Sequence, residues 1–272
     1  MTPEAGRPVD AADLYLELLK RALTHMLYWP LDAAPPDSYV AEELKAAVLE
    51  LLAREGTLDF SSVRAEGKDW PMFAQTMIGR ARIDNVHECV ERVLAEDVPG
   101  DLIEAGVWRG GVPILMRGIL RAHGVTDRSV FVADSFRGLP PPDAEQYPAD
   151  SGDVHHSAEY LAVSREDVER NFQLYDLLDD QVVFLEGWFR DTLPTVRQRS
   201  WSVVRIDGDL YQSTIEALTN LYPGLSVGGY LVIDDFAFDP CRRAVEDFRA
   251  QHGIEDPMIE VDWTGVYWRR SG

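Results

Sequence analysis

Short apolar runs alternate with segments of helical periodicity from Asp101 to about residue 252. The apolar runs lie near residues 101–107, 129–134, 181–186, 201–207 and 229–235. The helical segments lie near residues 111–123, 161–178, 188–198, 212–221 and 240–252. Strands that alternate with helices indicate βαβ units, in which helices cover both faces of a parallel sheet. The sequence therefore predicts an α/β fold with a mostly parallel sheet.

Two more strands are expected near residues 258–263 and 265–270, with a corner at Trp263-Thr264-Gly265. Because no helical segment separates them, they are expected to pair as an antiparallel hairpin. Together with the five parallel strands they complete a sheet of seven. Residues 138–158, which are rich in Pro, Asp, Gly and His, are expected to form a long loop.

The first 98 residues contain helical periodicity near residues 11–28, 38–54 and 72–96, and they precede the first strand. We expect residues 1–98 to form a helical extension, as a lid or an oligomer contact, and residues 99–272 to form the main domain. The apolar faces of these helices require a partner. A homo-oligomer, a dimer or higher, is the expectation, since most soluble oligomers are symmetric homo-oligomers.

The formal net charge of −21 argues against partners that are themselves strongly negative. A nucleic acid or an anionic membrane surface would be repelled over most of such a protein. No apolar run approaches the roughly 20 residues of a transmembrane helix, and the N-terminus lacks the pattern of a secretory signal. Cys89 and Cys241 form neither a metal-binding spacing nor a disulfide framework. We expect a cytoplasmic protein that acts on a small molecule.

Three carboxylates follow two of the predicted strands. Asp207 ends the run 202–206, and Asp234 and Asp235 end the run 229–233. If these strands are parallel neighbours, the three side chains meet at one edge of the sheet. Hard oxygen ligands of this kind suit Mg²⁺, which makes a bound hydroxyl more acidic. The alternative is a set of solvated acids at strand ends.

The turn after the first strand is rich in glycine and runs from Glu104 to Gly111. Such a turn brings the backbone close to a bound nucleotide. Trp108 stands where a second glycine would admit a pyrophosphate, which argues against a dinucleotide and is compatible with S-adenosylmethionine. The glycines Gly106 and Gly110 are also ordinary at a strand-to-helix turn.

The next two strands add candidate contacts to the cofactor. Asp134 ends the second strand, where an acid accepts hydrogen bonds from ribose hydroxyls, although Asp134-Ser135 is also a plausible turn cap. Trp188 and Phe189 follow the third strand, where an adenine would lie against an apolar wall. The same two aromatic residues are equally expected in the core.

These segments together resemble the macrocin O-methyltransferase family. The matching motifs are Glu104-x-Gly106-x-Trp108-x-Gly110, Val132-Ala133-Asp134-Ser135-Phe136, Glu186-Gly187-Trp188-Phe189, Arg205-Ile206-Asp207-Gly208-Asp209 and Ile233-Asp234-Asp235. The resemblance covers nearly the whole chain, from Leu14 to Arg270. It implies the Rossmann-like fold of class I methyltransferases, S-adenosylmethionine and Mg²⁺ as cofactors, and a deoxysugar hydroxyl of a glycosylated natural product as the acceptor.

The resemblance also implies a set of site residues. The metal ligands are Asp207, Asp234 and Asp235. The residues expected at S-adenosylmethionine are Thr76, Met77, Glu104, Gly106, Val107, Trp108, Gly110, Asp134, Ser135, Ser164, Glu186, Gly187, Trp188, Phe189 and Asp207. Residues 69–79 would pass over the cofactor and help to close the site; a helix packed on the sheet edge is the alternative.

A sugar hydroxyl is a weak acid, so a base must take its proton. Asp207, as ligand and base, is the first candidate and Asp209 the second; for Asp209 the alternative is an acid at a helix N-terminus. His155 or His156, in the long loop, is a further candidate. Two other functions remain open: a metal-independent O-methyltransferase for a phenolic or catechol-like acceptor, and a binding protein without catalysis.

Overall fold

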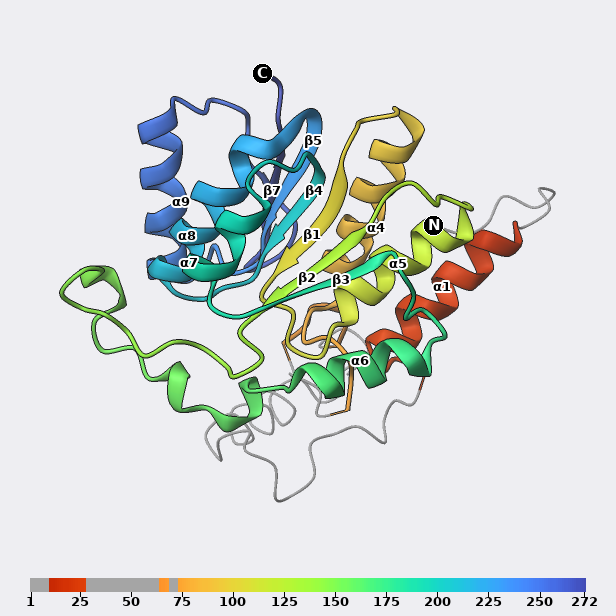
Figure 1. Cartoon of the computed structure of the whole chain (residues 1–272), viewed down its shortest axis with the longest axis horizontal. Helices are drawn as coiled ribbons and strands as arrows, with labels where there is room; N and C mark the ends of the chain where they lie inside the picture. Colours follow the sequence, from red (N-terminus) through yellow and green to blue (C-terminus); the bar gives the residue numbers. More distant parts are fainter. Residues whose placement is uncertain (1–9, 28–63, 69–72) are drawn as a thin grey trace, which may run out of the picture.

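A seven-stranded, mostly parallel sheet forms the centre of the protein (Figure 1). The computed structural model describes residues 10–27, 64–68 and 73–272. The strand order is β3-β2-β1-β4-β5-β7-β6, and only β7 runs opposite to the other strands, in antiparallel pairs with β5 and β6. The strands are β1 Asp101–Ala105, β2 Val130–Asp134, β3 Val182–Glu186, β4 Trp201–Ile206, β5 Leu225–Ile233, β6 Ile259–Glu260 and β7 Val266–Arg269. The predicted α/β architecture, including the closing hairpin, is confirmed.

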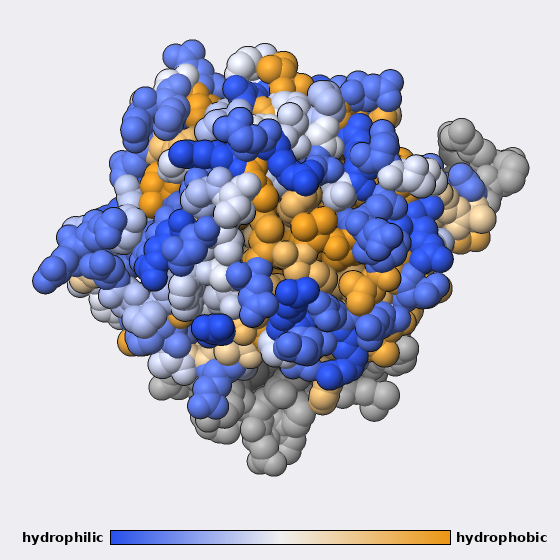
Figure 2. All heavy atoms as spheres, in the orientation of Figure 1, coloured by the Kyte–Doolittle hydropathy of each residue, from blue (hydrophilic) through white to orange (hydrophobic). Residues whose placement is uncertain are grey.

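Helices cover both faces of this sheet (Figure 1). One apolar core joins the sheet to α1, α4, α5 and α6, and a second core joins it to α8 and α9. The helices are α1 Ala11–Leu23, α4 Arg80–Ala95, α5 Gly111–Ala122, α6 Arg165–Leu174, α7 Phe189–Thr192, α8 Tyr211–Leu221 and α9 Asp239–His252. Hydrophilic side chains cover much of the face shown in Figure 2, which also has a hydrophobic area near its centre.

Residues along each central strand enter the two cores alternately. Leu102 of β1 and Val203 of β4 belong to the first core, whereas Ile103 and Val204 belong to the second. Successive side chains of a strand point to opposite faces, so a strand between two helical layers needs apolar residues on both of its faces. This requirement explains why the strands appear in the sequence as continuous apolar runs.

The parallel register brings the ends of β1, β4 and β5 to one edge. Ala105 pairs with Ile206, and Ile206 pairs with Ile233. The residues that follow these positions, Gly106, Asp207 and Asp234, therefore emerge side by side. Ligand sites of open α/β sheets lie outside the carboxyl ends of the strands.

The helix expected over residues 72–96 is shorter in the structure. α4 begins at Arg80, after Gly79 in extended backbone, and residue 72 lies outside the described part. Residues 73–79 use their backbone groups in tertiary contacts: the Gln75 N–H donates to Leu23 O at 3.1 Å, and Gln75 O accepts from the Gly111 N–H at 2.9 Å. These bonds replace the hydrogen bonds of a helix and fix the segment between α1 and α5.

The remaining expectations for the fold have mixed outcomes. The long loop after β2 contains short 3₁₀ turns at Pro148–Asp150 and His155–Ser157, with a third at Glu159–Leu161 before α6. The expected helix at 38–54 lies outside the described residues, and the division at residue 98 stays a prediction. Within the described ranges, no helix is long and apolar enough to span a membrane.

Candidate active site

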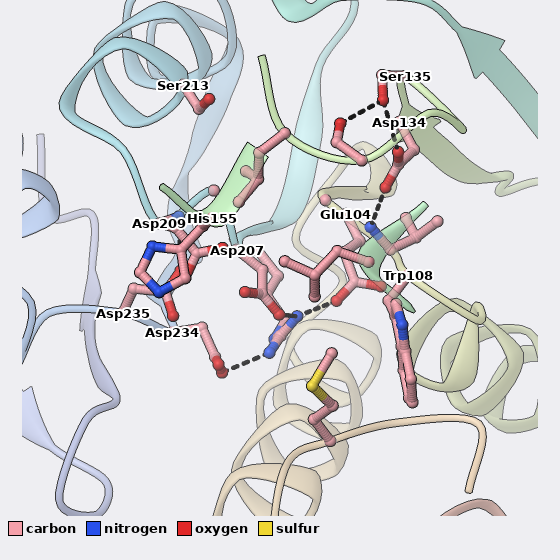
Figure 3. Close-up of a pocket in the computed structure, with 18 of the residues that line it drawn as sticks. Glu104, Trp108, Asp134, Ser135, His155, Asp207, Asp209, Ser213, Asp234 and Asp235 are labelled. Atoms are coloured by element: carbon pink, nitrogen blue, oxygen red, sulfur yellow. Dashed lines mark hydrogen bonds and ion pairs between the residues drawn. The ribbon is translucent and has the colours of Figure 1, made fainter. Parts of the chain in front are cut away.

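A cavity of about 520 Å³ opens at the carboxyl ends of the strands. Its wall combines residues that follow β1, β2, β4 and β5 with residues of the long loop and of the segment before α4. Figure 3 shows Asp207, Asp209, Asp234, Asp235 and the ring of His155 on one side, with Trp108, Asp134 and Ser135 on the other. The cavity therefore has an acidic side and a side formed by the turns after β1 and β2.

The three carboxylates predicted as metal ligands lie together. Each of Asp207, Asp234 and Asp235 offers one oxygen, and these three oxygens lie within 4.8 Å of one another. Asp234 and Asp235 are buried, whereas Asp207 is half-buried. This donor set fits the oxygen ligands that Mg²⁺ prefers. Binding of a metal here remains a prediction.

Two buried arginines hold Asp234 in place. Arg205, only 1% exposed, contacts Glu104, Asp207 and Asp234. Arg82 donates to Asp234 Oδ2 at 2.5 Å and to Asp262 Oδ2 at 2.9 Å. Burial opposes ionisation of Asp234, but the positive charges of Arg205 and Arg82 outweigh this effect and lower its pKa. Asp234 is thus ionised and held in a fixed orientation.

The pKa values of the neighbouring acids shift in the opposite direction. Burial, together with the charges of nearby carboxylates, raises the pKa values of Asp207 and Asp235. Burial and the charge of Asp207 raise the pKa of Asp209 to about 7. Carboxylates that repel one another at close range favour either a proton or a cation between them. This side of the cavity is therefore suited to a divalent cation.

Asp209 lies in an unusual backbone conformation. Its φ of +55° falls in the left-handed region, and its N–H donates to Asp235 Oδ2 at 3.0 Å. Asp209 precedes Leu210, the N-cap residue of α8, so the alternative of an acid at the helix N-terminus also fits its position. The residue lines the cavity as well, and a catalytic role for it stays a prediction.

On the opposite side, Asp134 connects the turns after β1 and β2. Its Oδ2 accepts from the Val107 N–H and its Oδ1 from the Phe136 N–H, both at 2.8 Å. Trp108 has φ of +48°, a backbone conformation that glycine usually adopts. Its indole Nε1–H donates to Tyr160 O at 2.9 Å. The turn thus keeps the shape of a glycine-rich turn while carrying an indole.

Glu104 offers an acceptor that suits a cofactor. It is 1% exposed and lines the cavity, and its Oε2 has no hydrogen-bond partner among the described residues. A buried oxygen of this kind requires a donor, and the ammonium group of S-adenosylmethionine is one. Other predicted cofactor residues that line the cavity are Thr76, Met77, Gly106, Val107, Trp108, Asp134, Ser135, Trp188, Phe189 and Asp207.

Four predicted cofactor residues do not line the cavity. A Cβ on Gly110 would lie 2.8 Å from Val168 Cγ1, so Gly110 packs against α6. Ser164 is the N-cap of α6, and Glu186 is exposed with Arg165 at 3.5 Å. Gly187 faces Thr192. For these four residues local packing, capping and charge pairing explain the positions, and their contact with a cofactor stays a prediction.

The loop histidines differ in their placement. His155 lines the cavity, and its Nδ1 lies 2.7 Å from Asp153 Oδ2. His156 is exposed and is not part of the cavity wall. Only His155 among these two is therefore placed near the acids.

Several residues of the site were not predicted from the sequence as functional. Arg82 was hidden in an expected helix, although an arginine on the buried side of a helix is a signal for a buried acid partner. Arg205 lies between Val204 and Ile206 in a strand that is buried on both faces, which carries the same signal. Asp150, in the long loop, gave no sequence signal for its contact with α8.

Comparison with known proteins identifies the family. The family described as Macrocin-O-methyltransferase (TylF) matches residues 12–270. An 8-demethyl-8-(2,3-dimethoxy-alpha-L-rhamnosyl)-tetracenomycin-C 4'-O-methyltransferase of Streptomyces olivaceus is 49% identical, over 96% of this chain and 94% of that protein. The mycinamicin III 3''-O-methyltransferase of Micromonospora griseorubida is 45% identical, over 97% and 99%. The demethyldecarbamoylnovobiocin O-methyltransferase of Streptomyces niveus is 56% identical, over 77% and 80%.

Solved structures agree with this assignment. The O-methyltransferase NovP has a TM-score of 0.84 and 48% identity, and the match covers 96% of this chain and 100% of that one. The calicheamicin methyltransferase CalS11, with a TM-score of 0.53, 19% identity and coverage of 98% and 99%, shares the fold. The predicted Rossmann-like fold is confirmed. The chain belongs to the macrocin O-methyltransferase family and is an O-methyltransferase.

Proposed function

We propose that this enzyme transfers the methyl group of S-adenosylmethionine to a sugar hydroxyl of a glycosylated natural product in antibiotic biosynthesis, with Mg²⁺. The observation that carries the proposal is the cluster of three carboxylates, Asp207, Asp234 and Asp235, inside the cavity of an O-methyltransferase. The names of the relatives support the acceptor class: one acts on a rhamnosyl-tetracenomycin, and others on mycinamicin III and demethyldecarbamoylnovobiocin.

The cofactor would occupy the side of the cavity formed by the turns after β1 and β2. Glu104 Oε2 would accept from its ammonium group, and Trp188 and Phe189 supply an apolar wall for its adenine. Asp134, whose oxygens already hold two backbone N–H groups, is fixed where ribose hydroxyls are expected. Glu104, Asp134 and the two aromatic residues would hold the cofactor beside the acidic side of the cavity.

On the acidic side, Asp207, Asp234 and Asp235 would hold Mg²⁺. When bound, Mg²⁺ lowers the pKa of a coordinated sugar hydroxyl. Arg82 and Arg205 hold Asp234, and Arg205 also contacts Asp207, so these two ligands would be preorganised for the metal.

Of the two carboxylates considered as base, Asp207 first and Asp209 second, we propose Asp209. Asp207 lies 3.0 Å from Arg205 Nη1 and belongs to the metal-binding group. Asp209 lies outside that group and lines the same cavity. A base must lie within reach of the proton that it takes. We therefore propose that Asp209 takes the hydroxyl proton while Asp207 remains a ligand.

The acceptor class is tested with a panel of substrates. The enzyme is incubated with S-adenosylmethionine, Mg²⁺ and three acceptors: a glycosylated macrolide or aminocoumarin, its aglycone, and a catechol. Fragment masses show whether a sugar or an aglycone carries the new methyl group. We expect methylation of the sugar alone. Transfer only to the catechol or the aglycone would contradict the proposal and favour a phenol methyltransferase.

A further inference from the structure

Asp150 is a buried acid that the chemistry above does not use. It lies in the long loop after β2 and is 1% exposed. Its Oδ1 accepts from the Tyr211 N–H at 2.7 Å and its Oδ2 from the Gln212 N–H at 3.0 Å. These are the first two residues of α8, 61 and 62 positions away in the sequence.

This contact supplies a cap that α8 does not have of its own. The N-cap residue is Leu210, whose side chain cannot accept a hydrogen bond. The first N–H groups of a helix have no partner within the helix. Asp150 satisfies two of them, and its negative charge suits the positive end of the helix dipole. The first N–H groups of α8 therefore depend on a residue of the loop for their hydrogen bonds.

The helix start determines where Asp209 points. Asp209, with φ of +55°, stands two residues before Tyr211. A left-handed backbone at a residue other than glycine persists only when its surroundings hold it. Asp235 holds this turn from one side, through the Asp209 N–H. Asp150 holds it from the other side, through Tyr211 and Gln212.

The same loop also forms part of the cavity wall. The Asp153 N–H donates to Asp150 O at 3.1 Å, and Asp153 in turn accepts from the His155 N–H and contacts its Nδ1. His155 and Tyr160 line the cavity. At its far end the loop accepts from the Trp108 indole through Tyr160 O. The loop thus joins the cofactor turn to α8, and Asp150 forms its hydrogen bonds to the backbone of α8.

We propose that Asp150 is a positioning residue for methyl transfer: its bridge to Tyr211 and Gln212 aligns the Asp209 turn with the wall that His155 and Tyr160 form. The inference rests on the proposed function. It requires that loss of Asp150 slow the chemical step and weaken binding of the acceptor. The affinity for the cofactor should not change, because Asp150 does not touch the cofactor side of the cavity.

The test compares Asp150→Ala, Asp150→Asn and a control, Asp143→Ala. Asp143 lies in the same loop, is exposed, and accepts only from the nearby Gln146 N–H among side-chain bonds of the described residues. For each variant the concentration of active sites is titrated with S-adenosylhomocysteine, and kcat and the acceptor KM are expressed per site. We expect Asp150→Ala to lose about tenfold to a hundredfold in kcat, the scale of a small misplacement of reacting groups. The affinity for S-adenosylhomocysteine should change less than about twofold.

Asp150→Asn keeps one acceptor oxygen and should lie between the wild type and Asp150→Ala; it also serves if Asp150→Ala fails to fold. Hydrogen exchange supplies a readout that needs no acceptor. The backbone amides of residues 155–161 and 208–213 should exchange faster in both Asp150 variants than in the wild type, and their exchange rates should be unchanged in Asp143→Ala. Wild-type kcat per site in Asp150→Ala, or unchanged exchange in these segments, would overturn the inference. A wild-type enzyme that methylates no sugar would instead overturn the proposed function, and the exchange result would still decide the role of Asp150.

Discussion

Arg82 on α4 and Asp234 at the end of β5 are joined by a hydrogen bond of 2.5 Å inside the protein. Arg205 contacts the other oxygen of the same carboxylate. Both arginines and Asp234 are buried. Asp234 is therefore at once a candidate metal ligand and the counter-charge for two buried cations, and its two roles predict different consequences from those of its neighbour Asp235.

Replacement of Asp234 should lower the free energy of unfolding. Asp234→Ala leaves Arg82 and Arg205 without part of their counter-charge, which costs about 3–5 kcal/mol for a buried pair. The matched control is Asp239→Ala: Asp239 also pairs with two arginines, Arg242 and Arg243, but is exposed, so its loss should cost less than about 1 kcal/mol. Urea denaturation measures both values. Equal stability of the two variants would show that the buried network does not support the fold.

Asp235→Asn should separate metal binding from stability. The amide oxygen of the new side chain keeps the size of the carboxylate and can still accept from the Asp209 N–H. One anionic ligand is lost, so the Mg²⁺ concentration for half-maximal activity should rise about tenfold or more. The free energy of unfolding in EDTA should not fall. An unchanged Mg²⁺ requirement would remove Asp235 from the metal site.

The stability of the metal-free protein should fall as the pH rises. The pKa of Asp209 is about 7 in the folded state against an ordinary value of 3.8. The folded state therefore binds the proton more tightly, and this contribution to stability, complete below about pH 4, is lost as the pH rises through about 7. Asp207 and Asp235 shift in the same direction.

Thermal denaturation in EDTA at about pH 5.5 and about pH 8 measures this effect. Asp209→Asn removes one titrating group and should reduce the difference in Tm between the two pH values. Added Mg²⁺ should raise the Tm at the higher pH, where it replaces the protons. A difference in Tm that is identical in Asp209→Asn would exclude Asp209 as a source of the pH dependence.

The sequence predicts much of the fold because the central strands are buried on both faces. Their apolar runs mark where each strand ends, and a parallel sheet then places Asp207, Asp234 and Asp235 at one edge. The start of α4 at Arg80 could not be predicted, since the backbone of Gln75 bonds to Leu23 and Gly111. Periodicity records side-chain patterns and contains no information about such tertiary backbone bonds.

The network of buried charges could not be predicted from the sequence for a similar reason. Arg82 and Asp234 are separated by 152 positions, and Asp150 and Tyr211 by 61. A buried charged residue signals that it needs a partner, but its position in the sequence does not identify that partner. Only the packing of α4 against the sheet and of the loop against α8 shows which charges are buried and which groups they hold.

Gly106→Ala tests the close approach of β1 and β4. A Cβ on Gly106 would lie 1.7 Å from Asp207 O, and φ there is +90°. Gly124 also has positive φ, +65°, but nothing lies within 4 Å of its Cβ position. Gly124→Ala should cost about 1–2 kcal/mol from backbone strain alone, whereas Gly106→Ala should cost more than about 4 kcal/mol or prevent folding. Similar costs would mean that the two strand ends move apart freely.

The central claim is that the acids at 207, 234 and 235 bind a divalent cation on which methyl transfer depends. The most direct measurement is the rate of transfer from S-adenosylmethionine to a glycoside by enzyme stripped with EDTA, followed by titration with Mg²⁺. We predict that the stripped enzyme has lost nearly all activity and that Mg²⁺ restores it along a saturable curve, which Asp235→Asn displaces to higher concentration. Full activity in excess EDTA would contradict the account.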